Sequence, residues 1–401
     1  MKPQPKNQTQ TYENKGEMPR ILRIQSFIEG RYEIRINVVN HDIELRKKGT
    51  NKPFQPINVN QLLFELYENN FSKFKEEFDV YLHAKVPQYD PFKVYFEKLP
   101  KWDNTTDYIA QLASFVRTDD QVWFERMFKK FLVRMVSQSL GKRFNKQCLC
   151  FVGKQNDGKT SFFVNLVPPS LKSYYKTGFD FSKGTKDSKI ALVGSFLINL
   201  DELTQFSKHD LNAEFKTILS ESTVKFRGLY EKYERAHERR ASFVASTNHP
   251  EFLTDETGNV RWLPFKIKSI NHDNGGLNGY ASIDIDKVWA QAYALHLTNF
   301  QAEMTADEVE HQSKLNRRFF KKTYEMEVIL KYFAPAQKGD KNAVFVTSTD
   351  LVDILKDKMK FSTNPIMLGR SLVGVGFEKA RNESSLYGYY VIDLLGVLSS
   401  S

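Results

Sequence analysis

Eight consecutive residues near the middle of the chain have the types and spacing of a phosphate-binding loop. Residues 153–160 read GKQNDGKT and fit the pattern G-x-x-x-x-G-K-[S/T] at every defined position. The apolar run CLCFV at 148–152 precedes the loop, and a helical pattern over 159–166 follows it. Backbone N–H groups in such a loop point at phosphates, and the helix N-terminus adds partial positive charge. We therefore predict an ATP site; the alternative is an ordinary glycine-rich turn.

Each part of this loop has an expected task. We expect Lys159 to reach the β- and γ-phosphates and the Thr160 hydroxyl to ligate Mg²⁺. We expect Gly153 and Gly158 to supply the backbone angles that side chains disfavour. The predicted nucleotide contacts are Gly153, Lys154, Gln155, Asn156, Asp157, Gly158, Lys159, Thr160 and Ser161.

Two acidic residues end a second apolar run. The run FLINL at 196–200 is followed directly by Asp201 and Glu202. The carboxyl ends of parallel strands face the crevice in which ligands bind. We expect Asp201 to hold Mg²⁺, directly or through water, and Glu202 to act as general base on the attacking water. The alternative for Asp201 is the N-cap of a helix.

A third apolar run and a later arginine complete the candidate site. Asn248 follows the run at 243–245 and is expected to bind the γ-phosphate or to orient the water. The alternative is a simple turn, which the sequence Asn-His-Pro also favours. Arg261 is a candidate arginine finger that acts on a neighbouring subunit's nucleotide. The alternative for Arg261 is a surface arginine packed against Trp262.

The elements that position these residues predict an α/β fold. The three apolar runs are bounded by turn or polar residues, as the buried strands of a parallel sheet are. Helical stretches over 159–166 and 212–221 lie between them, and this alternation implies a sheet covered on both faces. In front, a strand is expected at 32–38 and helices at 59–85 and from 91 to 140. The tail has the helix, helix, strand, turn, strand order of a winged helix.

Composition limits the class of protein. The chain has 401 residues, 41% hydrophobic and 26% charged, with a net charge of +10. These values are ordinary for a folded protein of two or three domains, and the positive balance favours an anionic partner. We see no membrane-length apolar run and no signal peptide, so we expect a cytoplasmic protein with no membrane partner. The only cysteines, Cys148 and Cys150, are expected as buried thiols.

The ordered set of loop, acids, asparagine and arginine resembles the superfamily 3 helicase branch of AAA+ ATPases. More narrowly, DEL at 201–203, STN at 246–248 and DETGNVRWLP at 255–264 resemble the virulence-associated E (VirE/VapE) family. YDPF at 89–92, LP at 99–100 and WDN at 102–104 extend the likeness to about residues 85–300, and LGR at 368–370 with GFEK at 376–379 looks like an appended winged helix. One departure is that residues 155–157 are larger than relatives usually have.

The resemblance implies an ATPase that forms an oligomer, expected as a hexamer, and acts on nucleic acid when a mobile element or phage replicates. The fold it implies is a P-loop AAA+ parallel sheet core with an α-rich N-terminal module and a C-terminal winged-helix-like domain. The predicted divisions are a disordered tail (1–20), an accessory region (21–85), a helical module (86–145), the P-loop ATPase domain (146–300), a connecting helix and linker (301–338) and the winged-helix-like domain (339–401).

The resemblance also places a DNA-binding hairpin over residues 224–240, facing the channel of the ring. Basic residues alternate there with aromatic ones, so phosphates could be neutralised and bases stacked. The alternative is a solvated, salt-bridged surface. Arg227, Lys232 and Arg235 are the predicted contacts, although Arg235, Arg239 and Arg240 could serve a subunit interface instead. In the tail, Arg370, Lys379 and Arg381 are expected on duplex DNA.

Together these features predict an ATP-dependent DNA helicase or translocase that uses ATP and Mg²⁺ and passes single-stranded DNA through a homo-oligomeric ring. Two alternatives stay open. One is a DNA-binding initiator or regulator that ATP switches and that does not unwind DNA. The other is a P-loop ATPase that does not act on DNA.

Overall fold

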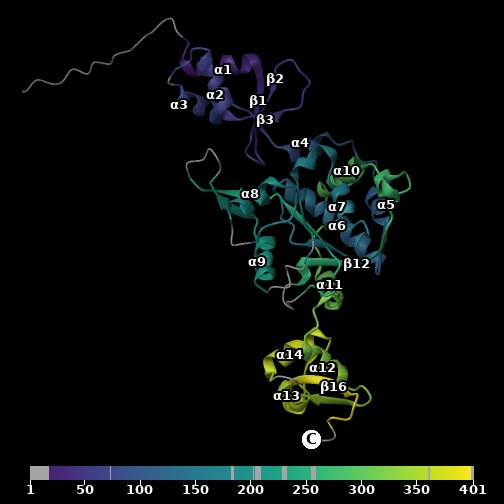
Figure 1. Cartoon of the computed structure of the whole chain (residues 1–401). Coiled ribbons are helices and arrows are strands. Elements are labelled where there is room, and N and C mark those ends of the chain that lie inside the picture. The colour runs from purple at the N-terminus through teal and green to yellow at the C-terminus, as the bar shows by residue number, and fades with distance from the viewer. Residues whose placement is uncertain are drawn as a thin grey trace, which may run out of the picture. The chain divides into compact units, whose positions relative to one another are not determined.

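The computed structural model describes residues 18–72, 74–181, 185–201, 203, 209–227, 233–253, 259–359 and 362–398, without the side chains of 209–213, 259 and 275. The chain forms two compact units, residues 1–94 and 95–401 (Figure 1). Most of the predicted disordered tail lies outside the described residues.

The first unit packs three helices against a four-stranded sheet of order β3-β2-β1-β4. Its elements are α1 (Arg20–Arg31), β1 (Tyr32–Asn37), β2 (Ile43–Lys47), β3 (Gln55–Pro56), α2 (Val59–Glu68), α3 (Lys75–Ala84) and β4 (Gln88–Tyr89). Ile24, Leu66 and Tyr81, one from each helix, are fully buried in its core. The sequence predicted one strand and two of these helices. It missed strand β4 beside β1 because that pairing is non-local: Ile36 lies opposite Gln88.

A six-stranded sheet of order β5-β12-β6-β11-β8-β7 forms the centre of the second unit. The five strands from β12 to β7 are parallel, and β5 is antiparallel to β12. The strands are β5 (Val116–Thr118), β6 (Cys148–Val152), β7 (Tyr175–Thr177), β8 (Leu197–Asp201), β11 (Ser242–Thr247) and β12 (Trp262–Ile270). The three predicted strands are β6, β8 and β11, so the predicted α/β fold with parallel strands is confirmed.

Strand β12 was not predicted, because a proline discourages a strand assignment. Pro264 pairs with Cys150 of β6, whereas β5 pairs only with residues from Ile267 onward. Pro264 therefore has a strand neighbour on one side only. On the other side no strand requires a hydrogen bond from the N–H that proline lacks.

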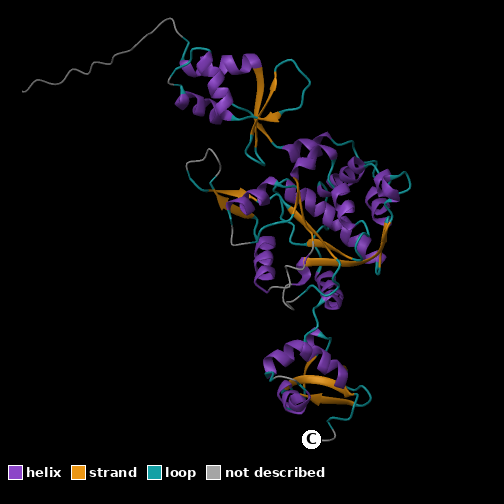
Figure 2. Cartoon of the chain, viewed as in Figure 1, coloured by secondary structure: helices purple, strands orange, loops and turns teal. Residues whose placement is uncertain are grey.

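Helices cover both faces of this sheet (Figure 2). Along β6, Cys148 and Cys150 face one core together with Phe215 of α9, while Phe151 lies against Phe124 of α6 and Phe162 of α7 on the other face. Both cysteines are buried and free. The helices are α4 (Pro91–Lys98), α5 (Tyr108–Ser114), α6 (Gln121–Ser139), α7 (Lys159–Leu166), α8 (Lys186–Gly194), α9 (His209–Ser220), α10 (Ile285–His296) and α11 (Ala306–Asn316). Among the described residues, no helix combines the length and apolarity needed to cross a bilayer.

The segments on either side of the predicted ATPase domain pack into the same body as its sheet. On one side, β5 is the sixth strand and α6 covers one face. On the other side, Gln312 of α11 accepts from Trp123 Nε1 at 2.8 Å, and Asn316 Nδ2 donates to the Trp262 carbonyl at 3.1 Å. The predicted divisions at 145 and 300 thus run through one packed body, since these contacts join residues far apart in sequence.

The C-terminal part has a core of its own, in which Ile329, Phe333, Leu351, Leu368 and Val391 are fully buried. Its elements are α12 (Tyr324–Tyr332), β13 (Phe333–Pro335), β14 (Ala343–Val346), α13 (Ser348–Leu355), α14 (Pro365–Gly374), β15 (Lys379–Arg381) and β16 (Tyr387–Asp393). The two expected helices and two expected strands are present. Part of the predicted connecting helix and linker (301–338) belongs to this domain core instead, because α12 packs in it and β13 pairs with β16.

Short 3-10 helices and one ribbon complete the second unit. The ribbon is β9 (Thr223–Phe226) with β10 (Arg235–Glu238). The 3-10 helices are η1 (Pro169–Tyr174), η3 (Asn259–Arg261), η4 (Asp273–Gly275), η5 (Tyr280–Ser282), η6 (Arg317–Phe319) and η7 (Lys356–Lys358).

Candidate active site

The sheet topology brings three strand ends together. Strand β11 lies between β6 and β8, and its register sets Thr247 opposite Val152 and Ser246 opposite Asp201. The loop after β6, the acid that ends β8 and the asparagine after β11 therefore share one carboxyl edge. A pocket of about 390 Å³ opens at this edge. Its lining residues are Gln155, Asn156, Asp157, Gly158, Lys159, Thr160, Ser161, Asp201, Ser246, Thr247, Asn248 and His272.

The loop uses its glycines in two different ways. Gly158 is the N-cap of α7 and has a φ of 79°, and Asn156 has a φ of 67°. Gly153 is not among the described residues with positive φ. A Cβ at Gly153 would instead lie 2.8 Å from Asp157 Oδ2 and 3.3 Å from Ile267 Cβ. The expectation that Gly153 supplies a special backbone angle is therefore wrong, and the residue provides space.

Lys159 crosses the pocket from α7 and is only 7% exposed. Its Nζ donates to the Gly153 carbonyl at 3.1 Å, to Asn248 Oδ1 at 3.1 Å and to the Lys154 carbonyl. Burial lowers the pKa of Lys159, whereas the carboxylates of Asp157 and Asp201 act against that shift. The predicted loop lysine and the predicted sensor asparagine are thus in direct contact. Gly153 and Lys154 do not line the pocket but present carbonyls to the ammonium.

Asp201 lies between two hydroxyl groups. Its Oδ1 accepts from Thr160 Oγ1 at 3.4 Å and from Ser246 Oγ at 2.5 Å. Mg²⁺ prefers such hard oxygen ligands and typically takes one or two protein groups while it keeps waters and phosphate oxygens. Thr160 and Asp201 therefore fit the predicted Mg²⁺ site. Glu202, the predicted general base, lies outside the described residues.

Three further residues line the pocket, and none of them had a predicted role, although Ser246 and Thr247 belong to the STN motif at 246–248. Ser246 and Thr247 are buried at the end of β11, and His272 follows β12. His272 also caps η4, where its Nδ1 accepts from the Asn274 amide at 3.1 Å. Their positions in the sequence could have indicated them, since each residue stands at or just beyond the carboxyl end of a parallel strand.

Arg261 does not line this pocket. It ends η3, and its Nε and Nη2 donate to Ser220 Oγ at 3.3 and 3.0 Å. The neighbouring Trp262 is 1% exposed and packs on Phe215, with ring centroids 4.8 Å apart. An arginine finger acts on another subunit, so its role stays a prediction.

The predicted DNA-binding hairpin has two described arms. Strands β9 and β10 are antiparallel, with Phe226 opposite Arg235 and Lys225 opposite Ala236. Residues 228–232, including Lys232, lie outside the described residues. Val224 and Phe226 are buried, whereas Lys225 and Arg227 are exposed and alternate with them. Lys225 was missed, although the period-2 alternation of the segment indicated its outward face.

Arg239 is a structural residue. It is 1% exposed, and burial lowers its pKa to about 10. Its guanidinium donates to the backbone carbonyls of Leu219, Glu221, Ala241 and Asn145. The suggestion that Arg239 serves a subunit interface is therefore wrong. Arg240 lies next to it and donates to the Ser139 carbonyl at 2.6 Å, while Arg235 is exposed.

Two of the three basic residues predicted in the tail line one hollow of the C-terminal part. Arg370 of α14 and Lys379 of β15 line a pocket of about 490 Å³. Tyr387 of β16 lines it too, with Lys379 Nζ 4.9 Å and the Arg381 guanidinium 4.5 Å from its ring centroid. Lys379 and Arg381 thus lie near the same aromatic ring, that of Tyr387.

Comparison with known proteins gives one family and one fold. The virulence-associated protein E-like domain matches residues 96–321. An apo structure of the NrS-1 C terminal region (305–718) has a TM-score of 0.52 at 12% identity, over 94% of this chain and 100% of that chain. An A form apo structure of that region has a TM-score of 0.50 at 12% identity, over 92% and 98%. At this identity the likeness shows the fold alone. No curated protein matches the chain.

Proposed function

Because the chain belongs to the virulence-associated protein E-like family, we propose that it is an ATP hydrolase that acts on DNA when a mobile genetic element or phage replicates. The observation that carries this proposal is the meeting of Lys159 with Asn248 and of Thr160 with Asp201 in one pocket. Four side chains from three strand ends there have the chemistry that binding and splitting a triphosphate requires.

The residues of the pocket divide this work. Lys159 exchanges its carbonyl and amide partners for phosphate oxygens, to which an ammonium makes stronger charged hydrogen bonds. The N–H groups at the start of α7 add donors for the same phosphates. Thr160 and Asp201 hold Mg²⁺, which neutralises charge on the phosphates. Asn248 orients the water, and Glu202 takes its proton.

More specifically, we propose that the chain is a P-loop ATPase of the superfamily 3, AAA+ type. We expect it to work as a ring, and the ring to be a hexamer. The five parallel strands with the loop after β6 support this assignment. Arg261 does not line the pocket of its own chain and is half-buried, so we assign it to the nucleotide of a neighbouring subunit, for which it would leave its hydrogen bonds to Ser220. In this arrangement Arg261 stabilises the charge that develops during hydrolysis.

We further propose that hydrolysis drives a helicase or translocase. The ribbon of β9 and β10 is the proposed single-strand contact, through Lys225, Arg227, Lys232 and Arg235. Lys225 and Arg227 support it, because they are exposed and alternate with Val224 and Phe226, which belong to the core. Arg235 is exposed too, although it lies opposite Phe226. The winged-helix-like C-terminal part is proposed to bind duplex DNA through Arg370 and Lys379.

A second function is an initiator that ATP switches and that binds duplex DNA without unwinding it. The hollow formed by Arg370, Lys379 and Tyr387 favours it, because this hollow lies in a part with its own core. Strand displacement on a forked duplex separates the two functions, since only the helicase displaces a strand.

ATP hydrolysis by Lys159→Ala protein tests the proposal. We expect turnover to fall about 100-fold or more, because a preorganised charge on the phosphates is lost. Lys98→Ala is the matched control, since Lys98 is an exposed lysine at the end of α4. Each protein is assayed with and without single-stranded DNA. Equal turnover in both variants would remove the pocket from the reaction, and turnover that DNA does not stimulate would count against the motor.

A further inference from the structure

A second polar pocket lies beside the loop that enters β6, at the opposite end of this strand from the first pocket. Its volume is about 520 Å³, which is within the range of small-molecule sites. No residue lines both pockets. The lining residues are Val133, Arg134, Ser137, Lys142, Arg143, His296, Thr298, Asn299, Phe300, Gln301, Ala302 and Glu303.

One wall of this pocket is the capped end of α6. Gly141 has a φ of 65°, and its amide donates to the Gln138 carbonyl at 3.0 Å. The Lys142 amide donates to the Ser137 carbonyl at 2.9 Å, which completes a left-handed helix cap. The Gln138 side chain also accepts from the Asn145 amide at 2.6 Å. Lys142 and the adjacent Arg143 therefore stand on an ordered turn, at the helix end where the dipole favours cations.

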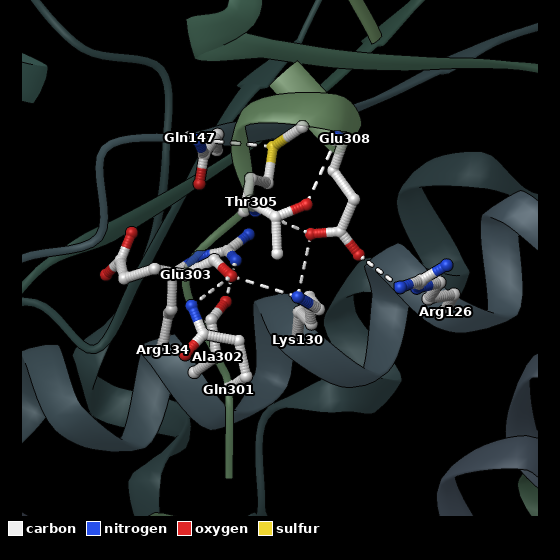
Figure 3. Close-up of polar contacts among 10 residues, drawn as sticks. Arg126, Lys130, Arg134, Gln147, Gln301, Ala302, Glu303, Thr305 and Glu308 are labelled. Carbon is white, nitrogen blue, oxygen red and sulfur yellow. Dashed lines mark hydrogen bonds and ion pairs between the residues drawn. The ribbon is translucent and has the colours of Figure 1, made fainter. Parts of the chain in front are cut away.

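The opposite wall is a loop fastened to α6 by two buried cations (Figure 3). Lys130 Nζ donates to the Glu303 carbonyl at 2.9 Å and to Glu308 Oε2 at 2.8 Å. Arg134 Nη1 donates to the Ala302 carbonyl, one residue earlier. Glu308 in turn completes the capping box of α11. Both walls are thus held by specific hydrogen bonds.

Two residues that line the pocket carry buried donors without a partner in the described part of the chain. Arg134 is 2% exposed, and within the described part of the chain its Nη2 has no hydrogen-bond partner. Ser137 is 6% exposed, and its hydroxyl is likewise without a partner there. Burial lowers the pKa of Arg134 to about 10, so it remains a cation at neutral pH. An unsatisfied buried donor is costly, and an acceptor in the pocket would remove that cost.

The charge of the pocket is positive. Among its lining residues, Arg134, Lys142 and Arg143 are cations, and Glu303 is the single carboxylate. The pKa of His296 is lowered by burial first and then by the charges of Arg143 and Lys142. Lys142 and Arg143 line the same pocket as His296, and positive charges there favour an anion.

We propose that this pocket binds the phosphate group of a nucleotide unit. Guanidinium and ammonium groups with a hydroxyl donor match the acceptor oxygens of a phosphate. The rings of His296 and Phe300 line the same space and offer surfaces on which a base stacks. A free nucleotide and a phosphodiester of a DNA strand present this same chemistry. The site does not depend on the proposed ATP hydrolysis, because it shares no residue with the first pocket.

The test compares the Lys142→Ala/Arg143→Ala double variant with Lys146→Ala. Lys142, Arg143 and Lys146 are exposed residues of one turn, but Lys146 does not line the pocket. All proteins also carry Lys159→Ala, so that the first pocket contributes little. Titration calorimetry measures binding of orthophosphate, of AMP and of a short oligothymidylate, and thermal unfolding verifies that each variant folds.

We expect the double variant to bind AMP or the oligothymidylate about tenfold more weakly than the Lys146→Ala protein. A loss for AMP identifies a free nucleotide as the ligand, and a loss for the oligothymidylate alone identifies the strand. Equal affinities of the two proteins, binding of orthophosphate only, or no binding by any protein would each overturn the proposal. ATP turnover of the Lys159→Ala protein tests the proposed function separately.

Discussion

Among single residues, Asp201 has the hydrogen bonds that fix its carboxylate in the candidate site. Its Oδ1 accepts from Ser246 at 2.5 Å and from Thr160 at 3.4 Å. Ser246 is 3% exposed on β11, so its hydroxyl is fixed by the packing of the sheet. In the proposed Mg²⁺ site Thr160 and Asp201 would be the ligands, whereas Ser246 would keep its hydrogen bond to Asp201. Ser246 is therefore a positioning residue for the carboxylate.

Substitution Ser246→Ala tests this role. Loss of a group that orients a metal ligand typically weakens metal affinity by about 10-fold or more. We expect the Mg²⁺ concentration for half-maximal ATP hydrolysis to rise by that factor, with recovery of turnover at saturating Mg²⁺. Ser246→Thr retains the hydroxyl and should keep a Mg²⁺ requirement close to that of the unmodified protein. An unchanged requirement in Ser246→Ala would show that Ser246 has no part in the metal site.

At the scale of elements, the ribbon of β9 and β10 presents two unlike faces. Val224 and Phe226 belong to the core cluster on one face of the sheet, and Phe226 stacks on His237 with ring centroids 4.2 Å apart. Lys225 and Arg227 alternate with these residues and are exposed. The ribbon is thereby fixed to the core of the second unit, while Lys225 and Arg227 remain outside.

The Lys225→Ala/Arg227→Ala variant tests the ribbon as the DNA contact. Each phosphate contact on a single strand contributes about 0.7 to the slope of log affinity against log salt concentration. We expect weaker binding of an oligothymidylate and a slope smaller by about 1.4. Lys176→Ala, at an exposed position of β7, should leave both values unchanged. A double variant with the same slope as the control would exclude this face.

At the scale of the whole molecule, local patterns predicted single elements better than the architecture. The strands β6, β8 and β11 and the helix after the loop at 153–160 lie where the sequence predicted them, because short apolar runs and helical spacing are local signals. Packing between residues far apart in the sequence could not be predicted from these local patterns. Examples are β5 and α11, which pack with the central sheet, and β4, which lies beside β1 in the first unit. Strand β12 was also missed, because it contains Pro264. The pairing of Lys159 with Asn248 required the order of the strands, which a sequence pattern does not contain.

We propose that this edge of the sheet holds a Mg²⁺-bound triphosphate, and direct binding of ATP tests this most closely. Titration calorimetry with ATP, with and without Mg²⁺, is carried out on the unmodified protein, on Lys159→Ala and on Lys98→Ala. We expect Mg²⁺-dependent binding that Lys159→Ala weakens about tenfold or more and that Lys98→Ala leaves unchanged. Equal ATP affinity in all three proteins, or none in the unmodified one, would contradict it.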